Sequence, residues 1–152
     1  MNAAHYHLMI NHIPMAGIIC GTCLILVGLI LKNEVLKKTA LYFFVISAIL
    51  LVPTYTTGGG AEKVLKAMMP GMTTDPVEQH EEMAMIALGG TGFLGLVSLV
   101  CIFIFWGQKP VKNAIAVVIA IISIAAIALT GYTAYLGGKI RHPEISVSTE
   151  RK

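Results

Sequence analysis

The sequence predicts an all-α integral membrane protein, a four-transmembrane-helix antiparallel bundle that forms a single membrane domain over residues 1–152. Its composition supports this class: 56% of the residues are hydrophobic and 12% are charged, whereas about a quarter of an ordinary globular chain is charged. Four stretches contain no Asp, Glu, Lys, Arg or His, and each is long enough to cross about 30 Å of hydrocarbon. These stretches are Ile13–Leu31, Ala40–Thr57, Met83–Trp106 and Ala114–Leu136.

The first two helices are expected over residues 10–32 and 39–57. The opening residues Met-Asn-Ala-Ala carry no positive charge, so we expect a permanent first helix and not a cleaved signal peptide. Pro53 lies one turn from the end of the second stretch, where a kink is expected. The glycines at positions 58–60 are expected to break this helix.

A longer outer loop over residues 58–82 leads to the third helix. Within it, residues 61–69 can form a short amphipathic helix on the membrane surface. The segment Asp75-Pro76-Val77-Glu78 has the pattern of a helix start, with Asp as N-cap, Pro at the first helical position and Glu three residues after the cap. The third helix is therefore expected over residues 76–107, and the fourth over residues 113–138.

The two short connections, residues 32–39 and 107–113, are rich in lysine. They hold five lysines and one acid, whereas six basic residues and seven acids lie on the other side. The positive-inside rule favours the cytoplasm for the lysine-dense connections. We therefore expect a multi-pass protein of the bacterial inner (cytoplasmic) membrane, with both termini, the long loop and every histidine on the periplasmic side.

The five histidines are the most informative polar residues. They are His5, His7, His12, His80 and His142. His12 precedes the first charge-free stretch, His80 precedes the third and His142 follows the fourth, so an antiparallel bundle brings these imidazoles to one depth. Imidazole is the commonest side-chain ligand for transition metals, which favours a metal or haem site here. The alternative is that these are ordinary histidines of a membrane interface.

Haem b is the leading cofactor hypothesis. It needs one or two axial imidazoles and a flat apolar slot between helices. His12 and His80 are the expected axial pair, with His142 and His7 as a second pair or as supporting ligands. An alternative is a Zn or Cu site, which needs three or four ligands and can use His80 with the adjacent Glu81 beside His12 or His142. A further alternative is that the chain holds no cofactor.

Two further features bear on the haem hypothesis. Lys139 and Arg141, beside His142, lie at the depth where haem propionates seek cations. Small residues in the first, third and fourth helices can open a slot, although they also suit close helix packing. They are Gly17, Gly21, Gly89, Gly90, Gly92, Gly95 and Gly131. Cys20 and Cys23 lack a following His, so they are no c-type haem attachment site and are interpreted as packing residues.

Several classes of function are disfavoured. The net charge of +3 is small and scattered, so no nucleic-acid partner is expected. The spans contain no ionisable side chain, which argues against a pump or coupled transporter acting alone. The sequence has no Ser/His/Asp or His-Glu-x-x-His pattern that would indicate hydrolysis.

Several motifs resemble those of a bacterial family of four-helix "predicted membrane proteins". His7-Leu-Met-Ile-Asn-His12-Ile-Pro14 is similar to its amino-terminal His-x4-His-x-Pro motif, and Gly137-Gly-Lys-Ile-Arg141-His142 to its carboxy-terminal Gly-Gly-x-x-Arg-His block. Thr57-Gly58 and His80-Glu81-Glu82 also look similar to blocks of that family. The resemblance covers nearly the whole chain. It implies a four-helix membrane fold and marks His7, His12, His80 and His142 as motif positions, but it implies no activity. The chain departs from the motif at Ile13, where an aromatic residue is expected.

These observations lead to one leading hypothesis and two rivals. The chain is expected to be a small b-type cytochrome-like subunit that passes electrons between a quinol, or another membrane partner, and a periplasmic redox subunit. We expect an electron-transfer or accessory subunit in preference to a stand-alone enzyme. The rivals are a cofactor-free accessory subunit of a larger membrane complex and a periplasm-facing Zn- or Cu-binding membrane protein.

Overall fold

The computed structural model describes residues 3–68 and 75–141, and within them every regular element is an α-helix. The helices are α1 (Ala3–Ile10), α2 (His12–Ile30), α3 (Glu34–Met68), α4 (Asp75–Ile104) and α5 (Asn113–Arg141). Four apolar segments are long enough to cross a membrane, and they correspond to α1 with α2, to α3, to α4 and to α5. The all-α, four-span membrane bundle predicted from the sequence is confirmed.

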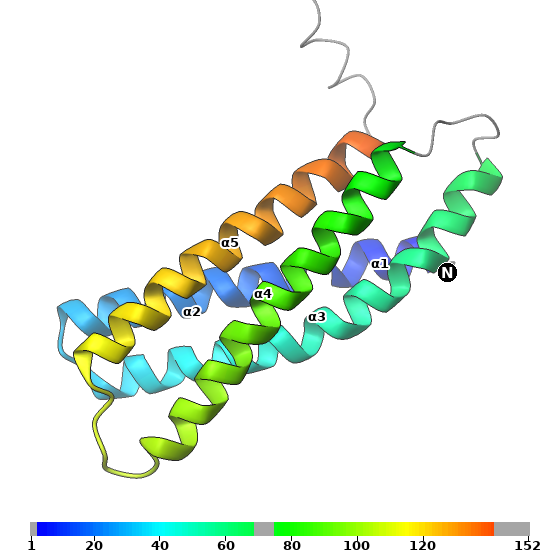
Figure 1. The fold of residues 1–152 in the computed structure, drawn as a ribbon. Coiled ribbons are helices and arrows are strands. Elements are labelled where there is room, and N and C mark those ends of the chain that lie inside the picture. Colours follow the sequence, from blue (N-terminus) through cyan, green and yellow to red (C-terminus); the bar gives the residue numbers. More distant parts are fainter. Residues whose placement is uncertain (1–2, 69–74, 142–152) are drawn as a thin grey trace, which may run out of the picture.

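The helices form an antiparallel bundle in which each long helix packs against its neighbours in the chain, and α2 also packs against α5 (Figure 1). The short connections α2–α3 and α4–α5 lie together at one end, which we call the short-loop end. The N-terminus and the end of α5 lie at the opposite end (Figure 1). We call this opposite end the histidine end, because His7 and His80 lie there.

The bundle interior is apolar, and so is much of its outer surface. Ile18, Phe44, Leu94 and Ile119, one from each long helix, are fully buried. Large apolar side chains that point outward are equally common, and Phe103 is 69% exposed. In lipid this causes no penalty, because hydrocarbon replaces water around the helices. Association of the helices therefore depends on close packing.

Glycines provide much of this packing. A Cβ atom at Gly17 would overlap Ser47, one at Gly95 would overlap Ala48, and one at Gly21 would lie 2.6 Å from Phe44 Cε1. The expectation that these glycines open a slot for a haem is therefore wrong for these positions, where α3 fills the space. At Gly90 a Cβ would lie 2.8 Å from Leu129 Cδ1, whereas Gly89 and Gly92 have nothing within 4 Å.

The second transmembrane helix begins earlier and ends later than the predicted residues 39–57. It begins at Glu34 because Asn33 Oδ1 accepts a hydrogen bond from the backbone N–H of Leu36 at 3.1 Å, which caps the first turn. It contains Pro53, and Figure 1 shows α3 bending along its length. It then continues through Gly58–Gly60 to Met68, so the predicted break, and with it a separate surface helix, is absent.

Two interactions explain why the glycines do not end α3. A helical glycine costs about 1 kcal/mol relative to alanine, but α1 packs along α3 in this region and offsets the loss. Farther on, Glu62 and Lys66 form an i,i+4 ion pair at 2.7 Å. The 35 residues of α3 rise about 52 Å, more than the ~30 Å of hydrocarbon, so this paired segment extends beyond the charge-free span.

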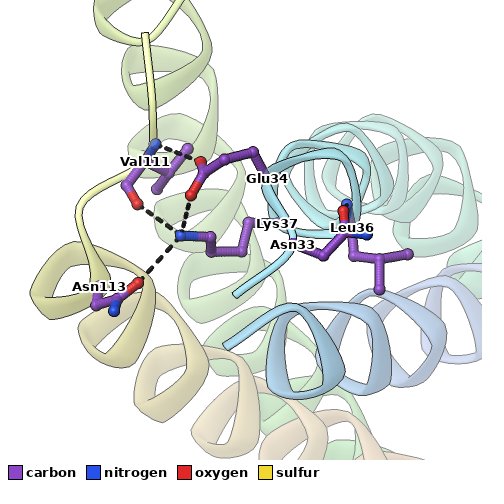
Figure 2. A network of polar contacts seen from close by, with 6 residues as sticks. All are labelled: Asn33, Glu34, Leu36, Lys37, Val111 and Asn113. Carbon is purple, nitrogen blue, oxygen red and sulfur yellow. Dashed lines mark hydrogen bonds and ion pairs between the residues drawn. The ribbon is translucent and has the colours of Figure 1, made fainter. Parts of the chain in front are cut away.

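A buried lysine joins the two connections at the short-loop end (Figure 2). Lys37 is 1% exposed, and its Nζ donates hydrogen bonds to Val111 O at 2.8 Å and Asn113 Oδ1 at 3.1 Å. Glu34 forms an ion pair with Lys37 and accepts a hydrogen bond from the N–H of Val111 at 2.7 Å. The start of α3 is thereby joined to the loop that precedes α5.

Candidate functional site

A break between α1 and α2 positions His7. Pro14 lacks an N–H, and its ring clashes with the carbonyl four residues earlier in a regular helix, which is that of Ile10. Helix α1 ends at Ile10, and α2 begins again at His12. The detached α1 packs against α3, and the His7 Nδ1 atom lies 3.1 Å from Thr57 Oγ1.

Oxygen atoms of Thr57 and Thr54 lie around the His7 ring. The Thr57 hydroxyl oxygen, 3.1 Å from His7 Nδ1, is 2.9 Å from the carbonyl of Thr54, and this carbonyl is also a hydrogen-bond partner of His7. When the Thr57 hydroxyl donates to Thr54, its oxygen accepts from His7 Nδ1–H, and Nε2 of the neutral ring carries the lone pair.

His80 has the same arrangement on the opposite pair of helices. It lies in the second turn of α4, and its Nδ1 is 3.0 Å from the backbone carbonyl of Thr133 on α5. A carbonyl oxygen only accepts, so Nδ1 carries the proton and Nε2 again has the free lone pair. The ring lies over Gly137, where a Cβ atom would be 3.1 Å from His80 Cε1. A side chain at position 137 would therefore displace the ring by a few tenths of an ångström.

His7 and His80 both lie at the histidine end, although 73 residues separate them in the sequence. Both rings are half-buried. They lie at the boundary of the charge-free spans, since Thr57 ends the second span and His80 precedes the third by one turn. An Nδ1–H tied to an oxygen acceptor, with Nε2 free, is the arrangement that orients a histidine for metal binding.

The other predicted site residues are placed differently. His12 is exposed, and within the described residues it forms no hydrogen bond with His80. Lys139 Nζ lies 5.0 Å from the centre of the Tyr135 ring, as a cation–π pair. His142 lies outside the described residues, as does the side chain of Arg141. Of the two motif histidines near the N-terminus, His7 is half-buried and bonds to α3, whereas His12 is exposed.

A cluster of the kind that holds Zn or Cu would need three or more His, Cys, Asp or Glu side chains. No such cluster occurs among residues 3–68 and 75–141. Glu81 and Glu82 are exposed. Cys20 and Cys23 are also exposed, and Cys101 is buried.

Sequence reasoning missed three residues of this site. Thr57 and Thr133 supply the acceptors for the histidines, and Asn11 lies in the break between α1 and α2. The side-chain oxygen of Asn11 is buried and has no hydrogen-bond partner in the described part of the chain. A buried acceptor without a donor costs about 1–3 kcal/mol, so a bound group with a donor would be stabilised there. The only sequence signal was that Thr57 belongs to the Thr57-Gly58 block of the resemblance and that Asn11 directly precedes the motif residue His12.

Comparison with known proteins gives no relative: no family model matches the chain, and neither a curated protein nor a solved structure matches it. The resemblance to the "predicted membrane proteins" therefore stays a prediction. Function is inferred from the geometry of the histidine end alone.

Proposed function

We propose that this chain is a small membrane electron-transfer subunit of the b-type cytochrome kind, with His7 and His80 as the axial pair of a haem at the histidine end. The observation that supports this most directly is the matched state of the two rings. His7 Nδ1 lies beside the Thr57 hydroxyl and His80 Nδ1 donates to the Thr133 carbonyl, an arrangement in which Nε2 of each ring would be the ligand atom. The sequence alone favoured His12 as the partner of His80; here His7 takes its place.

The surrounding residues suit the role. Haem bound by two imidazoles supplies one-electron chemistry and has no open iron position for a substrate. Thr57 and the Thr133 carbonyl orient the rings, and Gly137 leaves room for one of them. Lys139, two residues farther along α5, can turn from Tyr135 to pair with a propionate. Because α3 fills the space at Gly17, Gly21 and Gly95, the haem would lie at the rim and not deep in the bundle.

The location at one rim also suits a role within a chain of redox partners. The proposal places the histidine end on the periplasmic side of a bacterial cytoplasmic membrane, as the lysine-dense connections favour. The haem would exchange electrons with a quinol or with a neighbouring membrane or periplasmic redox subunit. Such an exchange requires a cofactor close to the surface of the protein.

An absorption spectrum tests the proposal. Protein purified in detergent from haem-replete cells should give a sharp reduced-minus-oxidised band in the visible α region. His7→Ala and His80→Ala should each abolish it, whereas the exposed His12→Ala should retain it. Helix content measured by circular dichroism must stay unchanged in all three variants.

Other outcomes separate the rival functions. Loss of the band in His12→Ala with retention in His7→Ala would favour the axial pair predicted from the sequence. Zinc or copper without porphyrin in elemental analysis would support the metal-binding alternative. A colourless, metal-free protein would contradict the proposal, and His7 and His80 would then be structural links between α1 and α3 and between α4 and α5, as in a cofactor-free accessory subunit.

A further inference from the structure

Two adjoining hollows lie at the short-loop end, far along the bundle from the histidines. The first, of about 300 Å³, lies between α3 and α4, and its lining includes Lys38, Tyr42 and Trp106. The second, of about 530 Å³, lies between the end of α4 and the start of α5, and its lining includes Lys109 and Lys112. Cys101 and Phe105 line both hollows, so the two adjoin at the last turns of α4.

The walls of these hollows are apolar, and their edges are positively charged. Leu41 and Ile102 line the first hollow, and Ile104 and Ile115 line the second. The charged residues that line them are lysines: Lys38 in the first, and Lys109 and Lys112 in the second.

Within the described residues no carboxylate forms an ion pair with these lysines. Glu34, the acid of the short connections, is paired with the buried Lys37 and lies near enough to Lys38 to attract it. Lys38 donates to the carbonyl of Gly107, a neutral partner. Lys109 and Lys112 are exposed and form no ion pair in the part of the chain that the structure describes. The edges of both hollows therefore have an excess of positive charge.

The histidine end has the opposite balance. Lys66 is paired there with Glu62, and further acids follow in the first turns of α4: Asp75, Glu78, Glu81 and Glu82. An anionic ligand would thus bind at the short-loop end in preference to the histidine end. The short-loop end thus combines apolar hollows with an excess of lysines.

From these features we infer that the short-loop end binds an anionic phospholipid, with acyl chains in the hollows beside Phe105 and the phosphate at Lys38, Lys109 and Lys112. Apolar walls accept hydrocarbon chains, and basic positions between transmembrane helices attract anionic headgroups. Trp106 and Tyr42 are the amphipathic aromatic residues that favour headgroup depth. A lipid seated here would hold the ends of α3, α4 and α5 together around the Lys37 network. The inference is independent of the haem proposal, because it uses the other end of the bundle.

The single tryptophan of the chain makes a direct test possible. Trp106 lines the first hollow, so its fluorescence reports which lipid lies there. The full-length protein is placed in phosphatidylcholine bilayers, and brominated phosphatidylglycerol or brominated phosphatidylcholine is titrated in. Brominated phosphatidylglycerol should quench Trp106 at the lower mole fraction, and added salt should weaken this preference.

Lysine variants identify the site. Lys38→Gln, and the double change of Lys109→Gln with Lys112→Gln, should each lower the preference for phosphatidylglycerol, by about fivefold for each lysine removed. Lys63→Gln is the matched control, because Lys63 is exposed at the histidine end, and it should retain the full preference. Circular dichroism verifies that every variant keeps its helix content.

Three results would overturn the inference. The first is equal quenching by the two brominated lipids in the unaltered protein, which would show ordinary surrounding lipid. The second is an equal loss of preference in Lys63→Gln. The third is displacement of brominated phosphatidylglycerol by inorganic phosphate at an ionic strength at which chloride leaves it bound, which would show that the lysines bind a free anion and that the acyl chains add nothing.

Discussion

Lys37 on α3 donates a hydrogen bond of 2.8 Å to the carbonyl of Val111, 74 residues later in the chain. This contact makes a charged side chain part of the bundle interior at the short-loop end. A buried ammonium is stabilised only where oxygens surround it, and here Glu34 and Asn113 complete the set. The two short connections therefore hold each other in position.

Replacing Lys37 by methionine, which keeps most of the side-chain volume, tests this role. Val111 O, Asn113 Oδ1 and Glu34 would each lose a partner, so the free energy of unfolding should fall by about 2–3 kcal/mol. Denaturant unfolding in detergent measures the change. Lys63→Met is the control, because Lys63 is exposed and should shift stability by less than about 0.5 kcal/mol. Equal effects of the two substitutions would contradict the role assigned to Lys37.

The fold was predictable from the sequence where a local signal decides the structure. Charge-free stretches of sufficient length define the spans, and the Asp75-Pro76 pattern places the start of α4, which begins at Asp75. The course of α3 through the glycines was not predictable. Their local cost is visible in the sequence, whereas the packing of α1 and the His7–Thr57 hydrogen bond that offset it join residues 50 positions apart.

Gly95 offers a test of close helix packing. Gly95→Ala should lower stability by about 1–3 kcal/mol, because its Cβ would overlap Ala48 on α3. Gly92→Ala is the matched control on the same helix, since nothing lies within 4 Å of its Cβ position. It should be neutral or gain up to about 1 kcal/mol. Introducing Ala48→Gly together with Gly95→Ala should restore stability, and failure of this rescue would show that the overlap is not the cause.

The candidate site was predictable only in part. The alternation of spans places every histidine of the described chain at one end of the bundle, as expected. The sequence did not indicate that His7 bonds to α3 while His12 is exposed, because that depends on how α1 packs before Pro14. His7 and His12 are both motif residues, and their spacing alone does not separate them.

Thr57 tests whether the orientation of His7 affects cofactor binding. Thr57→Val keeps the shape of the side chain but removes the acceptor for His7 Nδ1–H. Loss of such an orienting partner typically weakens metal affinity by about 10–100-fold, so haem retention during purification should fall by a comparable factor. Thr56→Val is the control, because the exposed Thr56 bonds only to the nearby carbonyl of Pro53. Similar haem content in the two variants would contradict an orienting role.

Gly59 distinguishes a continuous α3 from the break that the sequence predicts. In the structure it is helical and exposed, and nothing lies within 4 Å of its Cβ position. Gly59→Ala should therefore raise stability by up to about 1 kcal/mol, and Gly59→Pro should lower it by about 3 kcal/mol. The proline should also weaken haem retention, because it distorts α3 just after Thr57, to which His7 is bonded. A loop at this position would respond differently: it would tolerate proline and gain nothing from alanine. Thermal unfolding in detergent, measured for both variants, therefore decides between the two structures.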